Sequence, residues 1–240
     1  LRLDHHPDVL TMHLRMSMLM LVSAISFHKS IEGDRDIKLL DVIRQDSVSQ
    51  RRNLLAEWRH IMDDVNYRPV FQIAHDVLAA VPNRICNHLL DKAYKLVDDI
   101  EAIGMLRTHE IYSSALQRLL INGKRKSLAA FYTNPASAAF VAELVAEMLS
   151  VDYADETAVG KLRIADFACG TGTLLGAAYR AIMTKFRYAG GDDAKLHKRM
   201  MEHGLIASDV LPVSTHLTTT MLASQYPREW IRRTQIYTLP

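Results

Sequence analysis

Cysteine is scarce in this chain of 240 residues, which contains only Cys86 and Cys169. The two lie far apart, match no metal-ligand spacing and give no reason to expect a disulfide bond. Such sparing use of cysteine is typical of reducing compartments, so we expect a cytoplasmic protein. The eleven histidines are spread along the chain without ligand spacing, and we predict no metal site.

Long apolar runs are absent as well. The most apolar stretch, residues 16–27, is 12 residues long, whereas a helix that crosses a bilayer needs about 20. We therefore expect a buried helix here and no membrane partner. Because this stretch is rich in methionine, which packs adaptably, a partner-binding surface is the alternative.

A large excess of one charge sign is also missing. The 29 Lys and Arg residues against 27 Asp and Glu residues give a net charge of +2, so any basic footprint for nucleic acid must be local. The basic loop at 124–126, with Arg107 and Arg118 nearby, could touch DNA phosphates or could simply be solvated. The acidic cluster at 98–101 argues against a DNA-facing surface at that point.

Glycine is rare in the first half of the chain, where only Gly33 and Gly104 precede Gly123. Apolar residues there recur at helical spacing, as in residues 54–61. This pattern predicts five or six helices and no strand. We interpret residues 1–121 as a helical domain that contacts a partner or DNA.

From residue 122 onward the pattern changes to alternating strands and helices, which is the mark of an α/β domain with a parallel sheet. A polar linker is expected at 150–161. The predicted strands and helices after it are strand 162–168, helix 174–188, helix 192–204, strand 205–210, helix 211–224 and a possible third strand at 234–239. Residues 122–240 are therefore expected to form the opening part of a doubly wound domain, truncated before the about five strands that such a sheet needs.

A glycine loop follows the first predicted strand, in the stretch "DFACGTGT" that begins at Asp166. Gly170 and Gly172 can take positive φ angles and let a ligand approach the backbone, and the next helix directs its N–H groups at the loop. Asp166 would repel a pyrophosphate but would accept hydrogen bonds from an ammonium group or a hydroxyl. Because the spacing is also not G-x-G-x-x-G, the loop favours a zwitterionic cofactor over a dinucleotide.

A second acid, Asp209, ends the next predicted strand, where it can hold both hydroxyls of a ribose. In dinucleotide-binding folds such an acid follows the glycine loop by about 20 residues, and here the separation is larger. We interpret the charged helix at 192–203 as an insertion that accounts for the extra residues. The alternative is that Asp166 and Asp209 only cap helices.

Three stretches of this sequence resemble the adenine-N6 DNA methyltransferases, and more narrowly the modification subunits of type I restriction–modification systems and related defence methylases. They are "AAFYTNPASAAFVAELV" from residue 129, "DFACGTGTLL" from 166 and "IASDVLP" from 206. The helical segment "HEIYSSALQRLL" is similar to the one before them. The resemblance implies a Rossmann-like methyltransferase domain, S-adenosylmethionine as cofactor, double-stranded DNA as substrate, and possible specificity or restriction subunits as partners.

The resemblance also implies a set of cofactor-binding residues. They are Phe131, Tyr132, Thr133, Asp166, Ala168, Gly170, Thr171, Gly172, Asp209 and Val210. The first three would line the methionine part of the cofactor. Asp166 and the loop would hold its amino acid end, while Asp209 would take the ribose and Val210 would lie against the adenine.

This sequence departs from the family pattern in several places. Phe167 replaces the usual proline, Thr173 stands where glycine is frequent, and Asn134 separates Thr133 from Pro135. Cys169, beside a helix N-terminus, suggests a nucleophile, but the resemblance makes it a small packing residue.

The family's catalytic element, Asn/Asp-Pro-Pro-Tyr/Phe, does not occur in this sequence. The single Asn-Pro, at Asn134, is followed by Ala136 and belongs to the upstream element. We therefore assign no catalytic residue and expect this chain to contribute to cofactor binding without methylating DNA itself. Methylation of RNA or protein on the same cofactor fold, and a non-catalytic methylase-like scaffold, are the alternative functions.

Overall fold

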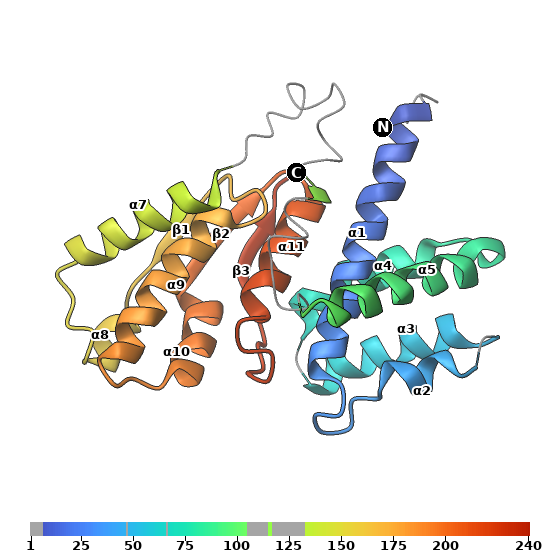
Figure 1. Cartoon of the computed structure of the whole chain (residues 1–240), viewed down its shortest axis with the longest axis horizontal. Helices are drawn as coiled ribbons and strands as arrows, with labels where there is room; N and C mark the ends of the chain where they lie inside the picture. Colours follow the sequence, from blue (N-terminus) through green and yellow to red (C-terminus); the bar gives the residue numbers. More distant parts are fainter. Residues whose placement is uncertain (1–6, 47, 66, 105–114, 117–132) are drawn as a thin grey trace. The chain divides into compact units, whose positions relative to one another are not determined.

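The computed structural model describes residues 7–46, 48–65, 67–104, 115–116 and 133–240 (Figure 1). The chain divides into two compact units. The first comprises Leu1–Asp64 and Phe71–Ala130, and the second comprises Val65–Val70 and Phe131–Pro240. The domain boundary expected between residues 121 and 122 lies outside the described residues. A short segment from the expected helical domain, Val65–Val70, belongs to the second unit.

The described N-terminal part of the chain is helical and has no strand, as the sequence predicts. Its elements are α1 (Pro7–Ile31), α2 (Leu40–Arg44), α3 (Gln50–His60), the π-helix η1 (Ile61–Val65), α4 (Arg68–Ala80) and α5 (Asn83–Ala102). Short turns separate α1 from α2 and, at Pro82, α4 from α5.

An aromatic group forms the centre of the first unit. Trp58 and Phe71 are fully buried, with ring centroids 5.5 Å apart, and Phe27 meets Phe71 edge-on at 5.9 Å. The Trp58 indole N–H donates to Nδ1 of His28 at 3.3 Å, so Nε2 of His28 carries the proton and donates to the Lys38 carbonyl at 2.9 Å. Burial lowers the pKa of His28, which keeps this ring neutral.

The apolar stretch 16–27 lies within α1 and most of its side chains are buried, which confirms the predicted buried helix. None of the described helices has the length and apolar character needed to cross a membrane.

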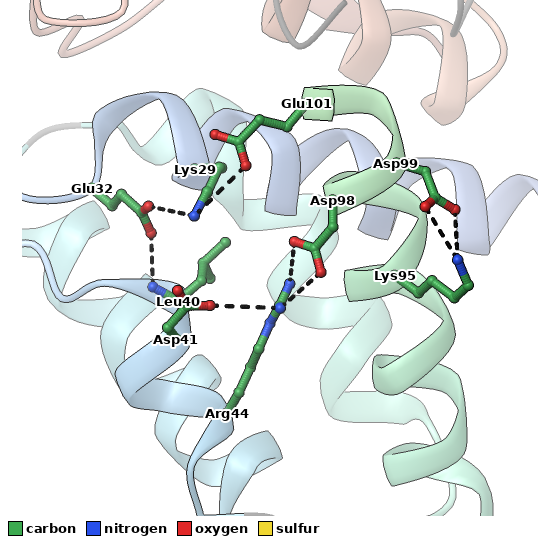
Figure 2. Close-up of polar contacts among 9 residues, drawn as sticks. All are labelled: Lys29, Glu32, Leu40, Asp41, Arg44, Lys95, Asp98, Asp99 and Glu101. Atoms are coloured by element: carbon green, nitrogen blue, oxygen red, sulfur yellow. Dashed lines mark hydrogen bonds and ion pairs between the residues drawn. The ribbon is translucent and has the colours of Figure 1, made fainter. Parts of the chain in front are cut away.

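The acidic residues at the end of α5 each lie beside a cation while their carboxylates stay exposed (Figure 2). Arg44 of α2 donates to both carboxylate oxygens of Asp98, each at 2.9 Å, and its guanidinium lies 4.3 Å from the centre of the Tyr94 ring. Arg44 therefore clamps α2 to α5 through a bidentate ion pair and a cation–π contact.

The two remaining acids of this cluster have partners too. Lys95 lies 3.0 Å from Asp99 one turn along α5, and Lys29 of α1 lies 3.8 Å from Glu101 and 2.8 Å from Glu32. Three cations thus serve five carboxylates, because Lys29 also pairs with Glu32 and Arg44 also lies 3.6 Å from Asp41. The surface remains acidic, and the exclusion of DNA from it stays a prediction.

We expect Arg44→Lys to lower the free energy of unfolding by about 1 kcal/mol, because lysine keeps the charge but loses the bidentate geometry. Lys95→Gln is the matched control, since Lys95 and Asp99 are both exposed and such pairs contribute below about 0.5 kcal/mol. Urea unfolding followed by circular dichroism measures both values. Equal effects of the two substitutions would contradict the clamp.

The second unit is an α/β unit. It contains α7 (Pro135–Met148), α8 (Glu156–Val159), β1 (Ile164–Asp166), α9 (Thr173–Tyr188), α10 (Asp193–Arg199), the π-helix η2 (Met200–Gly204), β2 (Leu205–Asp209), α11 (Pro212–Ala223) and β3 (Gln235–Thr238). The strands are parallel in the order β1-β2-β3. The strand predicted at 234–239 is confirmed as β3.

Two predicted elements of this unit differ from the structure. The first strand is limited to Ile164–Asp166, less than half of the predicted 162–168. The expected linker at 150–161 contains α8, a single helical turn that Asp155 caps by accepting from the Thr157 and Ala158 N–H groups. A cap and one turn are too short to produce helical periodicity in a sequence.

Helix α7 packs along α9 through alanine (Figure 1). Ala138, Ala142 and Ala146 are spaced by four and share one face of α7, and they meet Ala177 and Ala181 of α9. α9 contacts β1, while α11 contacts β2 and β3. These helices fix the loop after β1 and the end of β2 relative to one another.

The segment Val65–Val70 is part of the second unit. Val65, Tyr67 and Val70 are buried, and the Tyr67 hydroxyl donates to the carbonyl of Pro227. This hydrogen bond attaches the segment to the turn that follows α11.

A buried histidine, His197 of α10, lies next to α9 and the turn that follows α11. Nδ1 of His197 is 2.6 Å from the Tyr179 hydroxyl, and the Tyr226 ring lies 5.0 Å from the imidazole and donates its own hydroxyl to Asp193 at 2.8 Å. Nε2 of His197 has no hydrogen-bond partner among the described residues. Burial lowers the pKa of His197 to about 3.

We expect the second unit to lose stability in acid through His197. The His197 side chain binds a proton near pH 6.5 in the unfolded chain but only near pH 3 in the folded chain. The free energy of unfolding therefore falls as the pH falls from about 6.5 to about 3. His197→Gln should remove about 2 kcal/mol of this loss between pH 7 and pH 5. Urea unfolding at both pH values measures it. His88→Gln, at an exposed histidine, is the control, and equal pH dependence in wild type and His197→Gln would contradict the prediction.

Candidate functional site

The glycine loop and both predicted acids lie at the carboxyl edge of the sheet. Asp166 ends β1 and Asp209 ends β2, its parallel neighbour, with Asp166 paired in register with Ala207. In sheets of this kind the carboxyl edge is where ligands bind, because loops turn there into helix N-termini. The loop 167–172 runs from β1 to the first turn of α9 (Figure 1).

The loop is tied to the end of β2 by three hydrogen bonds. The Cys169 N–H donates to the Ser208 carbonyl at 3.0 Å, and the Ser208 hydroxyl donates to the Phe167 carbonyl at 3.1 Å. The Gly170 N–H donates to Oδ2 of Asp209 at 2.9 Å. The loop and Asp209 therefore form one rigid unit rather than two separate motifs.

Neither acid caps a helix. The N-cap of α9 is Gly172 and that of α11 is Leu211, and neither helix start has a side-chain cap. Asp209 instead accepts from Gly170 and, through Oδ1, from the Leu211 N–H at 2.8 Å. The helix-capping alternative for Asp166 and Asp209 is therefore wrong.

Asp166 is less engaged than Asp209. Its Oδ1 accepts from the Ala168 N–H at 3.2 Å, and its Oδ2 has no hydrogen-bond partner among the residues that the structure describes. Asp166 is partly exposed at the strand end. One of its oxygens is thus open to a donor from a ligand.

The two loop glycines have positive φ angles, 53° at Gly170 and 78° at Gly172, as expected. They differ in their surroundings. A Cβ at Gly170 would meet no atom within 4 Å, whereas one at Gly172 would lie 2.8 Å from Cγ2 of Thr218. Gly170 therefore leaves open space at the edge, while Gly172 lets α11 pack closely.

Thr218 of α11 is a site residue that the sequence analysis missed. Its hydroxyl donates to the Gly170 carbonyl at 3.1 Å and lies 3.8 Å from Sγ of Cys169. It is fully buried. The signal available in the sequence was the run of threonines at 218–220, which is unusual on the inner face of a helix.

Cys169 and Thr171 are the buried members of the loop. Burial raises the pKa of the Cys169 thiol to about 12, so the thiolate needed for a nucleophile is disfavoured. This supports the interpretation of Cys169 as a packing residue.

Exposed apolar groups lie beside the polar atoms of the edge. Val210, directly after Asp209, is 60% exposed, and Phe167, directly after Asp166, is 72% exposed. Ala168 is exposed as well. An apolar surface next to two carboxylates could receive a flat ring whose substituents carry hydroxyls.

The upstream element is described only in part. Phe131 and Tyr132 lie outside the described residues. Thr133 is exposed, and the structure shows no contact from it to Asp166 or Asp209 within its described part. Asn134 caps α7, accepting from the Ala136 N–H at 2.9 Å and the Ser137 N–H at 3.3 Å. The extra residue before Pro135 therefore acts as a helix cap.

In the part of the chain that is described, no group of three or more His, Cys, Asp or Glu side chains could hold a metal ion. Comparison of the chain with protein-family models, with curated proteins and with solved structures found no match.

We expect Gly172→Ala to destabilise the second unit by about 2–3 kcal/mol, because alanine would be strained at positive φ and would also collide with Thr218. Gly170→Ala, with the same conformational strain but open space, should cost about 1 kcal/mol. Urea unfolding of the two variants measures the difference. Indistinguishable losses would contradict the close packing of α11 at Gly172.

Proposed function

We propose that the second unit binds S-adenosylmethionine and that the chain belongs to an adenine-N6 DNA methyltransferase of the restriction–modification type. The observation that carries the proposal is the joining of two acids at one edge. Asp166 and Asp209 end adjacent parallel strands, and the intervening loop is bound to Asp209 by the Gly170 N–H at 2.9 Å.

The loop is poorly suited to a phosphate. A phosphate-binding loop directs its backbone N–H groups at the anion. Here the N–H groups of Cys169, Gly170 and Gly172 are used internally, by Ser208, Asp209 and the Cys169 carbonyl. With two carboxylates beside it, the edge favours a ligand that brings hydroxyl and ammonium donors.

The donors of S-adenosylmethionine match the acceptors of the edge. Each oxygen of Asp209 accepts one backbone N–H, and a carboxylate has about four acceptor sites, so capacity remains for the two hydroxyls of a ribose. Oδ2 of Asp166 can accept from an ammonium group. Val210 presents apolar surface next to Asp209, where an adenine ring can lie.

The strand order is compatible with the proposed fold. A doubly wound sheet has the strand order 3-2-1-4-5-6, and its ligand lies at the carboxyl edge next to strand 1. The order β1-β2-β3 found here matches strands 1, 2 and 3 of that sheet. A Rossmann-like methyltransferase domain accommodates this half-sheet with α9 following β1.

In this proposal the residues of the edge bind and orient, and none performs chemistry. When bound, S-adenosylmethionine would supply an electrophilic methyl group for the adenine amino nitrogen, leaving S-adenosylhomocysteine and releasing a proton. The chain's sequence lacks an Asn-Pro-Pro-Tyr/Phe element, so no acceptor for the amino group is assigned to it. Double-stranded DNA and possible specificity or restriction subunits are the partners that belong to this function.

Calorimetric titration tests the proposal. S-adenosylmethionine should bind the wild-type chain, and Asp209→Ala should weaken binding at least tenfold, since it removes a charged acceptor. Ser208→Ala is the control, because it removes a loop tether without touching either carboxylate. The wild type should also prefer S-adenosylhomocysteine to its 2′-deoxy analogue, and Asp209→Ala should not. Unchanged affinity in Asp209→Ala would refute the ribose assignment.

A further inference from the structure

The opposite edge of the same sheet carries a concentration of positive charge. Because the strands are parallel, the residues that precede them meet at one edge, away from the glycine loop. Those residues and the last turn of α10 supply what we call the amino-edge basic surface. Its members are Lys161, Arg163, Lys198, Arg199, Arg232 and Arg233.

The sheet register aligns two of these arginines. Arg163 directly precedes β1, and extending the pairing of Ile164 with Leu205 by one residue places it opposite Gly204. Extending the pairing of Ile206 with Gln235 by two residues places Arg233 on the other side of Gly204. Arg163 and Arg233 therefore both lie at the amino edge, just before β1 and β3 and on the two sides of Gly204.

Arg199 joins this row at Gly160, the residue after α8. A Cβ at Gly160 would lie 2.6 Å from Nε of Arg199, so the guanidinium lies against the glycine backbone. Arg163 donates to the Gly160 carbonyl at 3.3 Å and to the Leu162 carbonyl at 2.9 Å. Two guanidinium groups therefore gather around one glycine.

The charge of this surface is not neutralised within the described part of the chain. None of its six cations forms an ion pair there, in contrast to Lys195, which lies 2.8 Å from Glu156. The same segments contain two acids, Glu202 and Glu229, and Glu202 accepts the backbone N–H of Arg232 at 2.9 Å. The side chain of Arg233 lies 3.4 Å from Nδ1 of His203.

We propose that the amino-edge basic surface binds the phosphate backbone of duplex DNA. Like charges held close together repel, and an evenly anionic partner removes that repulsion while its counterions are released. Arginine forks match phosphate oxygens in bidentate geometry. A row of cations across a stiff sheet edge suits a stiff, uniformly charged rod better than a protein surface, where both signs are mixed.

The inference does not depend on the cofactor proposal, because the two surfaces lie at opposite ends of the strands. It predicts affinity without base specificity, since phosphate contacts carry no sequence information. The helix ends nearby offer another role for these cations, because α8 and α10 end beside them and cations stabilise helix C-termini. The experiment must separate DNA binding from that stabilisation.

Fluorescence anisotropy of a labelled 20-base-pair duplex, without cofactor, provides the test. In about 50 mM salt the wild-type chain should bind, and Arg163→Gln/Arg233→Gln should bind at least about tenfold more weakly. The slope of log affinity against log salt should become shallower by about 2, one unit for each lost phosphate contact. Arg163→Lys/Arg233→Lys keeps both charges and should keep most of the slope.

Arg52→Gln/Arg59→Gln is the matched control, because it removes two exposed charges from α3 in the other unit and should leave affinity within about twofold. Circular dichroism establishes that each variant is folded. Should the double glutamine variant not fold, amine acetylation of the wild type replaces it, and DNA should protect Lys161 and Lys198 at least threefold more than Lys185.

Several results would overturn the inference. These are no binding of the duplex by the wild type, equal affinity and slope in the glutamine variant, or a loss of thermal stability in that variant with unchanged DNA binding. Tenfold tighter binding of polyglutamate or of an RNA duplex of the same sequence would assign the surface to a different partner. Loss of DNA binding with intact S-adenosylmethionine binding would support it and leave the cofactor proposal unaffected.

Discussion

The hydrogen bond from the Gly170 N–H to the Asp209 carboxylate is the contact on which the carboxyl edge depends. It connects the loop after β1 to the end of β2, and the parallel pairing of these strands is what brings the two within 2.9 Å. The same carboxylate also accepts from the Leu211 N–H, so one side chain positions both the loop after β1 and the segment that leads from β2 into α11.

Packing from α11 supports that contact from beneath. Thr218 fills the space that Gly172 leaves and donates to the Gly170 carbonyl, so the helix holds the loop from the side opposite to Asp209. The geometry of the edge is therefore set by buried tertiary contacts, while the surface above Gly170 stays open. A preorganised binding site needs this combination of a loop fixed by buried contacts and a surface that a ligand can reach.

The local parts of this architecture could be predicted from the sequence, and the distant contacts could not. Strand, acid, glycine loop and helix follow one another within 25 residues, and each has its own periodicity or turn chemistry. By contrast, the bonds from Asp209 and Thr218 to the loop join residues 39 and 48 positions apart, and Arg44 reaches Asp98 across 54. The single turn of α8 was missed because it is too short to show periodicity.

The participation of Val65–Val70 in the second unit has a consequence for how the chain is made. Tyr67 and the carbonyl that it binds, at Pro227, are 160 residues apart. At about 5–20 residues per second, a ribosome needs on the order of 10–30 s to proceed from one to the other. During that interval the Tyr67 hydroxyl lacks the carbonyl that it binds in the folded chain. The contact between this segment and the turn after α11 therefore forms only after residue 227 has been synthesised.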